Sequence, residues 1–345
     1  MSERIKVRPG DKEELQQAEM ELCLHRIFKR TLTFILSVLI FTFLTMYHLG
    51  PSLKIFQIMM WYKRQKRGVK VKYVEHEGYR FCYFSRGQPG LQPSILMLHG
   101  FSFNKDVWLN AIKLFPKGLH LVCLDMPGHG ETTRLLGESY TAATQAQRIH
   151  QFVKCIDMDR KPFHLVGTST GGMVAGLYAI LYPSDVCCLS LLCPAGLRYP
   201  KASDLVKYLK KQKRSMQSHN FLKHGVYHSS RTNLQHLKGY LAASRPDKAF
   251  YINYFLDLSS AKSKYSLHDN MSKIRAPTQI IWGKDDKVLD PSGADILANA
   301  VVNSQVHMLE KCGHFIVLDR PRKSAKLLLQ FYHSVCGNVD SKIWT

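Results

Sequence analysis

Short apolar runs recur along the chain behind residue 70, separated by stretches with helical periodicity. Two early runs, Val71–Glu75 and Tyr79–Phe84, alternate apolar and polar residues around His76–Gly78, which predicts a β-hairpin. The later runs are apolar throughout, as strands of a parallel sheet covered on both faces are. These runs are Ser94–Leu98, His120–Leu124, Phe163–Val166, Val186–Leu192, Thr278–Trp282 and Gln305–Leu309. With helices expected between them, as at Ala142–Ile156 and Gly171–Tyr182, the pattern predicts an α/β fold: a mostly parallel sheet with antiparallel strands at one edge.

The alternation of strands and helices stops between about Tyr199 and Ser266 and then resumes. An insertion at this point follows the sixth strand and therefore leaves the sheet at its carboxyl edge, where such sheets bind ligands. We therefore expect a core made of residues 71–198 and 264–338, with a cap inserted at residues 199–263.

The N-terminal part of the chain contains one long apolar segment. Thr31–Leu49 has nineteen residues without a Lys, Arg, Asp or Glu, and Gly50 and Pro51 follow it. A helix of that length covers roughly 28 Å, about the hydrocarbon thickness of a bilayer. A cleaved signal peptide is the alternative, but the run is too long and no small-x-small cleavage site follows it. The segment predicts a transmembrane helix at 31–49, behind an N-terminal extension at 1–30.

The net charge is strongly positive and unevenly distributed. The 48 Lys and Arg residues against 26 Asp and Glu give +22, of which Lys54–Lys72 and Lys201–Tyr240 supply +15. The composition, 45% hydrophobic and 21% charged, excludes a disordered chain or a coiled-coil rod. A basic surface attracts phosphate on nucleic acid or on an anionic membrane. Because no zinc spacing, RNP-like pattern or helix-turn-helix accompanies the charge, we expect contacts with anionic lipids and none with nucleic acid.

The charge and the cysteines also bear on location. Residues 50–70 form a basic juxtamembrane linker that outweighs Arg26, Lys29 and Arg30 on the other side of the span, and this favours a cytosolic C-terminal domain. Nine cysteines lack a repeated CxxC or metal-ligand spacing, which indicates a reducing compartment and no metal site. We expect a single-pass protein of an endomembrane, either the endoplasmic reticulum or the late endosome and lysosome, without a cofactor.

A Gly-x-Ser-x-Gly sequence occupies Gly167–Gly171, between a predicted strand and a predicted helix. A nucleophilic serine in this position needs a sharp turn, and the glycines on either side let neighbouring backbone pass without a clashing Cβ. The helix that begins beside the serine offers its N–H groups to an oxyanion. Ser169 is therefore the candidate nucleophile.

A serine nucleophile needs a base, and the base needs a carboxylate that orients it. His314 lies in the loop after the last predicted strand, and Asp286 in the loop after the strand before it. Both loops leave the carboxyl edge of the sheet, as the serine turn does. Asp285 and Asp290 are alternative acids, and Asp286 fits best.

The turn after the third predicted strand, His99–Phe101, is placed to aim the Phe101 N–H at the serine. Together with the Thr170 N–H it would hold the oxyanion. The segment Asp125–Gly130 after the next strand is interpreted as a rigid structural turn, with His129 at most a supporting residue.

From about Trp61 to Phe331 the sequence resembles the α/β-hydrolase fold superfamily, and within it the membrane-anchored monoacylglycerol lipases of the α/β-hydrolase-domain family. The resembling stretches are Ser94–Phe101, Pro162–Ser169, Pro194–Leu197, Lys264–His268, Pro277–Lys284, Cys312–His314 and Arg320–Lys323. The resemblance implies Ser169 as nucleophile, Asp286 as acid and His314 as base. It also implies a single-pass protein with a cytosol-facing serine ester hydrolase that acts on monoacylglycerols and some lysophospholipids.

Two departures from that family limit the resemblance. The segment Lys201–Ala261 is divergent and very basic, which leaves the substrate least defined, and Thr170 stands where the family has Met. Two other functions remain as alternatives. His314 and Asp319 form an H-x4-D spacing associated with acyl transfer to lysophospholipids, although Asp319 is also placed to cap the following helix. A catalytically silent membrane scaffold would require a damaged triad.

Overall fold

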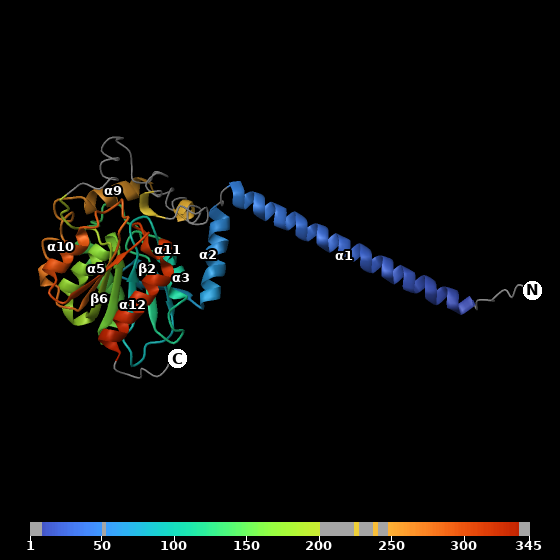
Figure 1. Cartoon of the computed structure of the whole chain (residues 1–345), viewed down its shortest axis with the longest axis horizontal. Coiled ribbons are helices and arrows are strands. Elements are labelled where there is room, and N and C mark those ends of the chain that lie inside the picture. Colours follow the sequence, from blue (N-terminus) through green and yellow to red (C-terminus); the bar gives the residue numbers. More distant parts are fainter. Residues whose placement is uncertain (1–8, 50–52, 201–223, 228–236, 241–247, 338–345) are drawn as a thin grey trace, which may run out of the picture. The chain divides into compact units, whose positions relative to one another are not determined.

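The computed structural model describes residues 9–49, 53–200, 224–227, 237–240 and 248–337. The chain divides into two compact units, Met1–Ser52 and Leu53–Thr345. Figure 1 shows the helix α1 of the first unit and the mixed α/β second unit. Each unit is described by itself.

The first unit contains one helix, α1 (Pro9–Leu49), so the expected extension and the expected span belong to the same helix from Pro9 onward. Within it, Glu19–Leu44 is long and apolar enough to cross a membrane, with a mean hydropathy of 1.8. The hydroxyls of Thr31, Thr33 and Ser37 donate to the backbone carbonyls four residues before them, at 2.8–2.9 Å. Such bonds hide polar groups inside the helix and suit it to a lipid environment.

The second unit is built on an eight-stranded sheet in the order β1-β2-β4-β3-β5-β6-β7-β8. The strands are β1 (Lys70–His76), β2 (Tyr79–Arg86), β3 (Ile95–Leu98), β4 (Leu121–Leu124), β5 (Phe163–Thr168), β6 (Val186–Leu192), β7 (Thr278–Gly283) and β8 (Ser304–Leu309). β2 pairs antiparallel with β1 and β4, and all pairs from β4 to β8 are parallel. This confirms the predicted mostly parallel sheet with antiparallel strands at one edge.

Helices cover both faces of the sheet, and two neighbouring residues of β5 identify the faces. Phe163 contacts the ring of Tyr178 in α5 (Thr170–Leu181). His164 points to the other face, where it stacks on Tyr332 of α12 (Pro321–Cys336). α4 (Ala142–Cys155) lies beside α5, and α3 (Leu109–Ile112) contacts α12. β6 and its neighbours are therefore buried on both sides, which explains their unbroken apolar runs.

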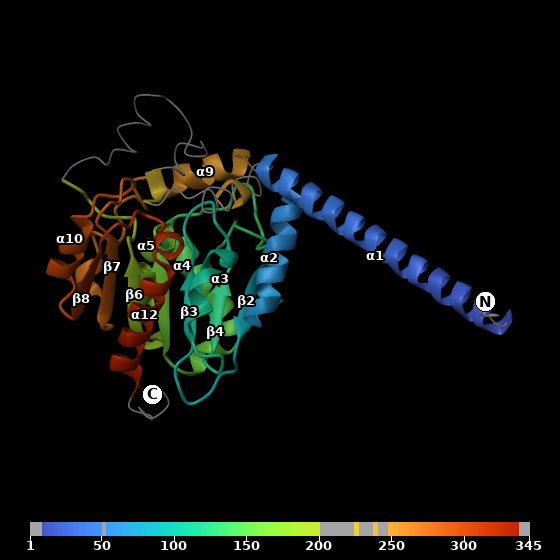
Figure 2. The same ribbon diagram turned by 45° about the vertical axis from the view of Figure 1, so that its right-hand side comes forward.

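The remaining described helices lie beyond the strands and on one flank. They are α10 (Gly293–Ala300), α11 (Ile316–Asp319), α9 (Lys248–Leu258) and α2 (Leu53–Arg67), with 3-10 turns at Lys105–Trp108, Met158–Arg160, Pro183–Asp185 and Met271–Lys273. Much of the expected cap, residues 199–263, lies outside the described residues. Its helix α9 is described. In Figure 2, α9 lies over the end of the sheet to which the insertion belongs.

Residues 53–67 form the helix α2, where the sequence had suggested a linker. Phe56 and Met60, four residues apart, bury one stripe of this helix in the core, and Arg64 continues the stripe with an ion pair to Asp106. The opposite side exposes Ile58, Trp61 and Tyr62, each about 60% accessible (63%, 57% and 58%). The basic residues that suggested a linker thus belong to an amphipathic helix of the second unit, packed against the core of that unit.

Candidate active site

Ser169 lies in a strained turn between β5 and α5. Its backbone has φ 55° and ψ −121°, a conformation that non-glycine residues seldom adopt. The neighbouring backbone is too close for side chains: a Cβ on Gly167 would lie 2.3 Å from the carbonyl oxygen of Gly171, and one on Gly171 would lie 2.3 Å from that of His99. The two glycines therefore allow the turn that lifts the serine hydroxyl from the sheet edge.

The structure brings His314 and Asp286 to this serine. His314 Nε2 lies 2.9 Å from Ser169 Oγ, and His314 Nδ1 lies 2.8 Å from Asp286 Oδ2. Both side chains are buried, with 2% and 0% exposure. The other carboxylate oxygen of Asp286 accepts the N–H groups of Val288 and Leu289, at 2.8 and 2.9 Å. The carboxylate is thereby fixed, with one oxygen directed at the imidazole.

This arrangement sets the direction of the hydrogen bonds. A carboxylate can only accept, so His314 Nδ1 carries the proton and Nε2 presents a lone pair to the Ser169 hydroxyl. The two alternative acids have other partners: Asp285 accepts the N–H of Cys312, and Asp290 accepts that of Ser292. Of the three candidates, Asp286 is the one hydrogen-bonded to the imidazole.

The turn after β3 packs directly against the serine. A Cβ on Gly100 would lie 3.0 Å from Ser169 Cβ, which is tighter than most Cβ contacts, so glycine lets the turn approach the serine closely. Within the described part of the chain, neither the Phe101 N–H nor the Thr170 N–H has a hydrogen-bond acceptor. Both belong to the residues next to Gly100 and Ser169. These are the two N–H groups that the sequence analysis assigned to an oxyanion hole, and that assignment stays a prediction.

His99 holds this turn in place. Its Nε2 accepts the Met126 N–H at 2.9 Å, so its Nδ1 carries a proton, which it donates to the Gly100 carbonyl at 2.8 Å. Burial lowers the pKa of His99 to about 4, and the ring is neutral at pH 7. His129, interpreted as structural, lies edge-on to the rings of His99 and Phe101, and burial lowers its pKa to about 3.

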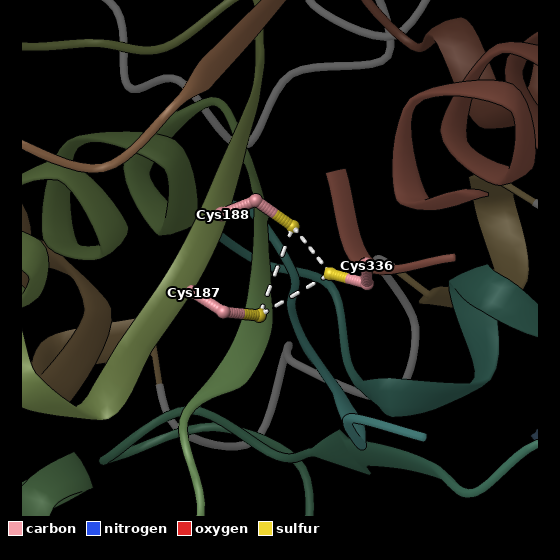
Figure 3. A group of neighbouring side chains, drawn as sticks. All are labelled: Cys187, Cys188 and Cys336. Atoms are coloured by element: carbon pink, nitrogen blue, oxygen red, sulfur yellow. Dashed lines mark hydrogen bonds between the residues drawn. The ribbon is translucent and has the colours of Figure 1, made fainter. Parts of the chain in front are cut away.

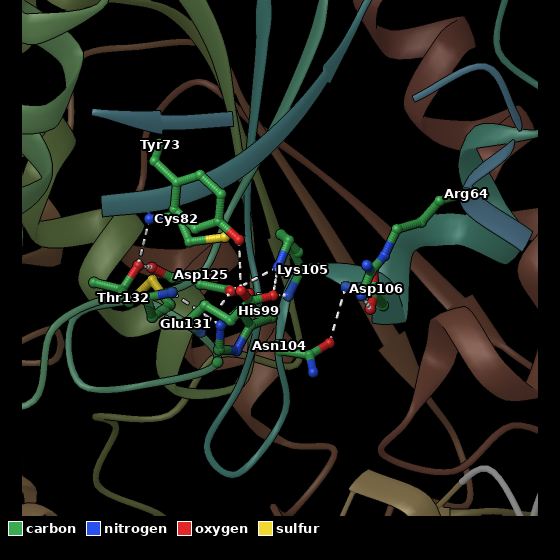
Figure 4. Close-up of polar contacts among 12 residues, drawn as sticks. Arg64, Tyr73, Cys82, His99, Asn104, Lys105, Asp106, Asp125, Glu131 and Thr132 are labelled. Carbon is green, nitrogen blue, oxygen red and sulfur yellow. Dashed lines mark hydrogen bonds and ion pairs between the residues drawn. The ribbon is translucent and has the colours of Figure 1, made fainter. Parts of the chain in front are cut away.

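A buried ion pair beneath the turn was missed by the sequence analysis. Lys105 Nζ lies 2.8 Å from Asp125 Oδ2, and the Lys105 N–H donates to Oδ1 at 2.7 Å. Figure 4 shows both residues among their polar neighbours. Burial alone would raise the pKa of Asp125, but the Lys105 ammonium outweighs burial and lowers it. No local pattern marks a buried lysine, because lysine side chains normally reach solvent.

Aromatic side chains of α9 cover the turn from the cap side. The Phe101 ring lies 5.7 Å from that of Tyr254 and 5.9 Å from those of Tyr251 and Phe255. The divergent sequence of the cap gave no signal for these contacts, since they depend on how α9 lies over the sheet. They make the surroundings of the Phe101 N–H apolar, which strengthens any hydrogen bond formed there.

Two other groups near His314 have structural partners. Asp319 accepts the N–H groups of Gly313 and Tyr227, at 2.9 and 2.7 Å. The N-cap residue of α12 is Arg320, so the expectation that Asp319 caps this helix was wrong. Asp319 instead fixes the loop that carries His314. Cys193 offers a sulfur within 4.8 Å of the imidazole and the Asp286 carboxylate, but burial raises its pKa well above the usual range and its Sγ donates to the His314 carbonyl at 3.0 Å.

Comparisons with known proteins agree with this geometry. The model of the alpha/beta hydrolase fold family matches residues 93–321. Monoacylglycerol lipase ABHD6 of Mus musculus is 49% identical to the chain over 320 residues, which cover 89% of this chain and 95% of the mouse protein. The Homo sapiens protein of the same name is 48% identical over the same shares of the two chains.

Solved structures show the same architecture. A bacterial membrane phospholipase A, described as a virulence factor, superposes with a TM-score of 0.74 at 26% identity, over 89% of this chain and 99% of its own. A serine hydrolase involved in carbazole degradation superposes with a TM-score of 0.63 at 21% identity, over 76% of this chain and 98% of its own. The second likeness is one of fold alone.

Proposed function

We propose, from the premise that this chain belongs to the alpha/beta hydrolase fold family, that it is a membrane-anchored serine hydrolase that cleaves monoacylglycerol esters. Ser169 is the nucleophile, His314 the general base and Asp286 the residue that orients the base. The Phe101 and Thr170 N–H groups form the oxyanion hole.

One observation carries this proposal: the unbroken hydrogen-bonded chain from Asp286 through His314 to Ser169, with the serine at positive φ. Each link has a chemical purpose. The carboxylate fixes the tautomer in which Nε2 accepts, and Nε2 accepts the proton that Ser169 must lose to become a nucleophile. A purely structural serine would need neither the strained turn nor a base within hydrogen-bonding distance.

The reaction follows from these contacts. Ser169 Oγ attacks the ester carbonyl while its proton moves to His314 Nε2, and the imidazolium that forms is stabilised by Asp286. The negative charge on the carbonyl oxygen is received by the Phe101 and Thr170 N–H groups. The imidazolium then protonates the departing glycerol oxygen, and an acyl-serine remains. A water molecule, deprotonated by His314, attacks the acyl-serine, and the imidazolium returns the proton to Ser169 Oγ as the acyl bond breaks and the fatty acid leaves.

The proposed substrate class rests on the relatives and on the anchor. The mouse and human relatives compared above carry the name monoacylglycerol lipase, and the chain matches 95% of their length. A monoacylglycerol partitions into a membrane, where an enzyme carrying a helix such as Glu19–Leu44 can meet it. Lysophospholipids, which also carry one acyl ester, are a second group of substrates that the same site would accept.

The membrane contact includes α2. This helix exposes Trp61 and Tyr62, aromatic residues typical of the membrane interface, next to the basic residues Lys66 and Arg67. Each cation near an anionic surface contributes about 1 kcal/mol. The same excess of positive charge favours a cytosolic catalytic unit. The membrane that we propose is an endomembrane, either the endoplasmic reticulum or the late endosome and lysosome.

The test uses the full chain in detergent or vesicles and the variant Ser169→Ala. We expect release of fatty acid from monoacylglycerol, and labelling by a fluorophosphonate probe, in the wild-type chain alone. In a serine protease with the same kind of triad on an unrelated fold, loss of the nucleophile lowers kcat by about 10⁶-fold. Membrane association of the variant should be unchanged, since Ser169 lies outside α1 and α2. Undiminished hydrolysis by Ser169→Ala would refute the assignment of the nucleophile.

A second arm of this experiment addresses the substrate. Monoacylglycerol, lysophospholipid and diacylglycerol with the same acyl chain are compared by kcat/KM. We expect monoacylglycerol to give the highest value. A chain that reacts with the fluorophosphonate at Ser169 but leaves monoacylglycerol intact would keep the serine hydrolase and remove the proposed substrate class.

A further inference from the structure

Three cysteines meet at the end of the sheet that lies away from Ser169. Cys187 and Cys188 stand at the beginning of β6, and Cys336 is the last residue of α12. The three Sγ atoms are 3.5, 3.7 and 4.0 Å apart, and Figure 3 shows them directed at one another. Cys188 is buried, while Cys187 and Cys336 are half-buried, so the group is reachable from solvent. We call these residues the thiol cluster.

A β-bulge explains why two consecutive residues of one strand contribute to the thiol cluster. Successive side chains of a regular strand point to opposite faces. Here the register between β5 and β6 shifts, because Phe163 pairs with Val186 whereas His164 pairs with Cys188. Cys187 is the extra residue, and a bulge of this kind redirects the side chain that it carries. Both sulfurs consequently lie toward α12 and Cys336.

The spacing of the sulfurs suits one metal ion. The point equidistant from all three lies about 2.2 Å from each sulfur, and an ion about 0.8 Å above their plane would make three bonds of the usual Zn–S length of about 2.3 Å. That height is also the height of a tetrahedral ion above the plane of three of its ligands. Three thiolates can thus take up Zn²⁺ without moving the backbone, and the fourth position remains for water.

The neighbouring His164 has an unused lone pair on the same face of the sheet. Ser190 Oγ donates to Gln279 Oε1 and accepts from His164 Nε2, at 3.3 and 2.8 Å, so the proton of the ring is on Nε2. His164 Nδ1 is fully buried, and no residue that the structure describes donates to it. Burial lowers the pKa of His164 to about 4, so the ring stays neutral. A metal-bound water is the kind of donor that this nitrogen lacks.

Zinc binding would change the protonation and the net charge of the thiol cluster. Binding of one Zn²⁺ replaces three S–H bonds by three Zn–S bonds and releases three protons to solvent, leaving a site with a net charge of −1.

We propose that Cys187, Cys188 and Cys336 form a zinc-binding site with three thiolate ligands, which ties the end of α12 to β6 independently of the active site. Zinc rather than a hard cation fits, because thiolates prefer soft and borderline ions. The metal contributes no step to ester hydrolysis and links two elements that are distant in sequence.

The test loads the purified full chain with Co²⁺ in the presence of a non-thiol reductant. Tetrahedral cobalt bound to thiolates gives an intense charge-transfer absorption, which should saturate at one Co²⁺ per chain and disappear on addition of Zn²⁺. Cys336→Ser and Cys187→Ser should each lose the absorption and weaken Zn²⁺ binding at least about 10-fold. Cys155→Ser, which changes a half-buried cysteine of α4, is the matched control and should bind as the wild type does.

Labelling of Ser169 by a fluorophosphonate in every variant shows that the second unit is folded, so a loss of metal binding is separable from unfolding. A metal site that persists in Ser169→Ala separates this proposal from the proposed enzymatic function. Absence of the absorption in the wild-type chain, equal absorption in Cys336→Ser, or a Cys187–Cys336 disulfide that survives the reductant would overturn the zinc site.

Discussion

The two ends of the sheet are organised differently. At the carboxyl end, Ser169, His314 and Asp286 follow three separate strands, and each polar group has a partner that fixes it. At the amino end, the thiol cluster consists of three cysteines whose sulfurs contact one another. It lies next to a histidine nitrogen to which none of the described residues donates a hydrogen bond. The first group is preorganised for proton transfer. The second is preorganised for a metal ion that replaces the protons of the three thiols. One sheet thus supports two kinds of chemistry, because different residues lie at the carboxyl and amino ends of its strands.

The largest expected effect is at the carboxyl end. In Asp286→Asn, the Val288 and Leu289 N–H groups keep the amide oxygen, so the NH₂ group faces His314 Nδ1. The imidazole must then carry its proton on Nε2 and cannot accept one from Ser169. We expect kcat for ester hydrolysis to fall about 10⁴-fold, as in other triads.

The control for this variant is Asp290→Asn, because the Asp290 carboxylate accepts the Ser292 N–H and was one of the two alternative acids. Initial rates with the same ester should remain close to the wild-type rate. Equal losses in the two variants would remove Asp286 from the triad.

The second effect concerns the stability of the carboxyl end. Lys105→Met leaves the Asp125 carboxylate buried without its cation, which should lower the free energy of unfolding by about 3–5 kcal/mol. Lys284→Met breaks an exposed pair with Glu310 and should cost less than about 1 kcal/mol. Denaturant unfolding of both purified variants measures the difference. Similar midpoints would mean that the buried pair is not needed to hold the oxyanion turn.

The third effect is a dependence of stability on pH. His99 and His129 have folded pKa values of about 4 and 3, below the ordinary 6.5. Between pH 6.5 and 4 the unfolded chain therefore binds more protons than the folded one, so the free energy of unfolding decreases as the pH falls. The loss is on the order of 2 kcal/mol per histidine at pH 5. Thermal unfolding at pH 7, 6 and 5 measures it, and His129→Gln should reduce the slope.

The smallest effect is expected at the amino end. Cys187→Ser should leave kcat for ester hydrolysis within about twofold of the wild-type value, because among the described residues the thiol cluster shares no hydrogen-bond partner with the triad. The assay is the same ester hydrolysis in the same detergent. A large loss of activity with an unchanged midpoint of unfolding would show that the two ends of the sheet are coupled.

The carboxyl end was more predictable because its chemistry is local in sequence. Gly167–Gly171 encodes the strained turn, and the strand before it and helix after it are visible in the apolar pattern. The strands themselves were predicted within one or two residues for the same reason. By contrast, α2 was missed because its stripe of Phe56 and Met60 is short and surrounded by basic residues that read as a linker.

The amino end was not predictable from spacing. Cys187 and Cys336 are separated by 149 residues, and the bulge that turns Cys187 depends on the register between two strands. The Lys105–Asp125 pair is similar, since each residue is unremarkable in its own segment. Contacts that depend on how distant elements pack leave no periodic signal in the chain.

The outward side of α2 has a practical consequence. Ile58, Trp61 and Tyr62 are solvent-accessible, while the other side of α2 packs against the core. A truncated chain that begins at Leu53 would therefore retain an exposed surface that is both apolar and positively charged. Such a fragment should bind to anionic liposomes although it lacks α1. It should also self-associate when it is concentrated without detergent. Removal of α1 would therefore weaken membrane binding, but the remaining chain would still bind lipid surfaces through α2.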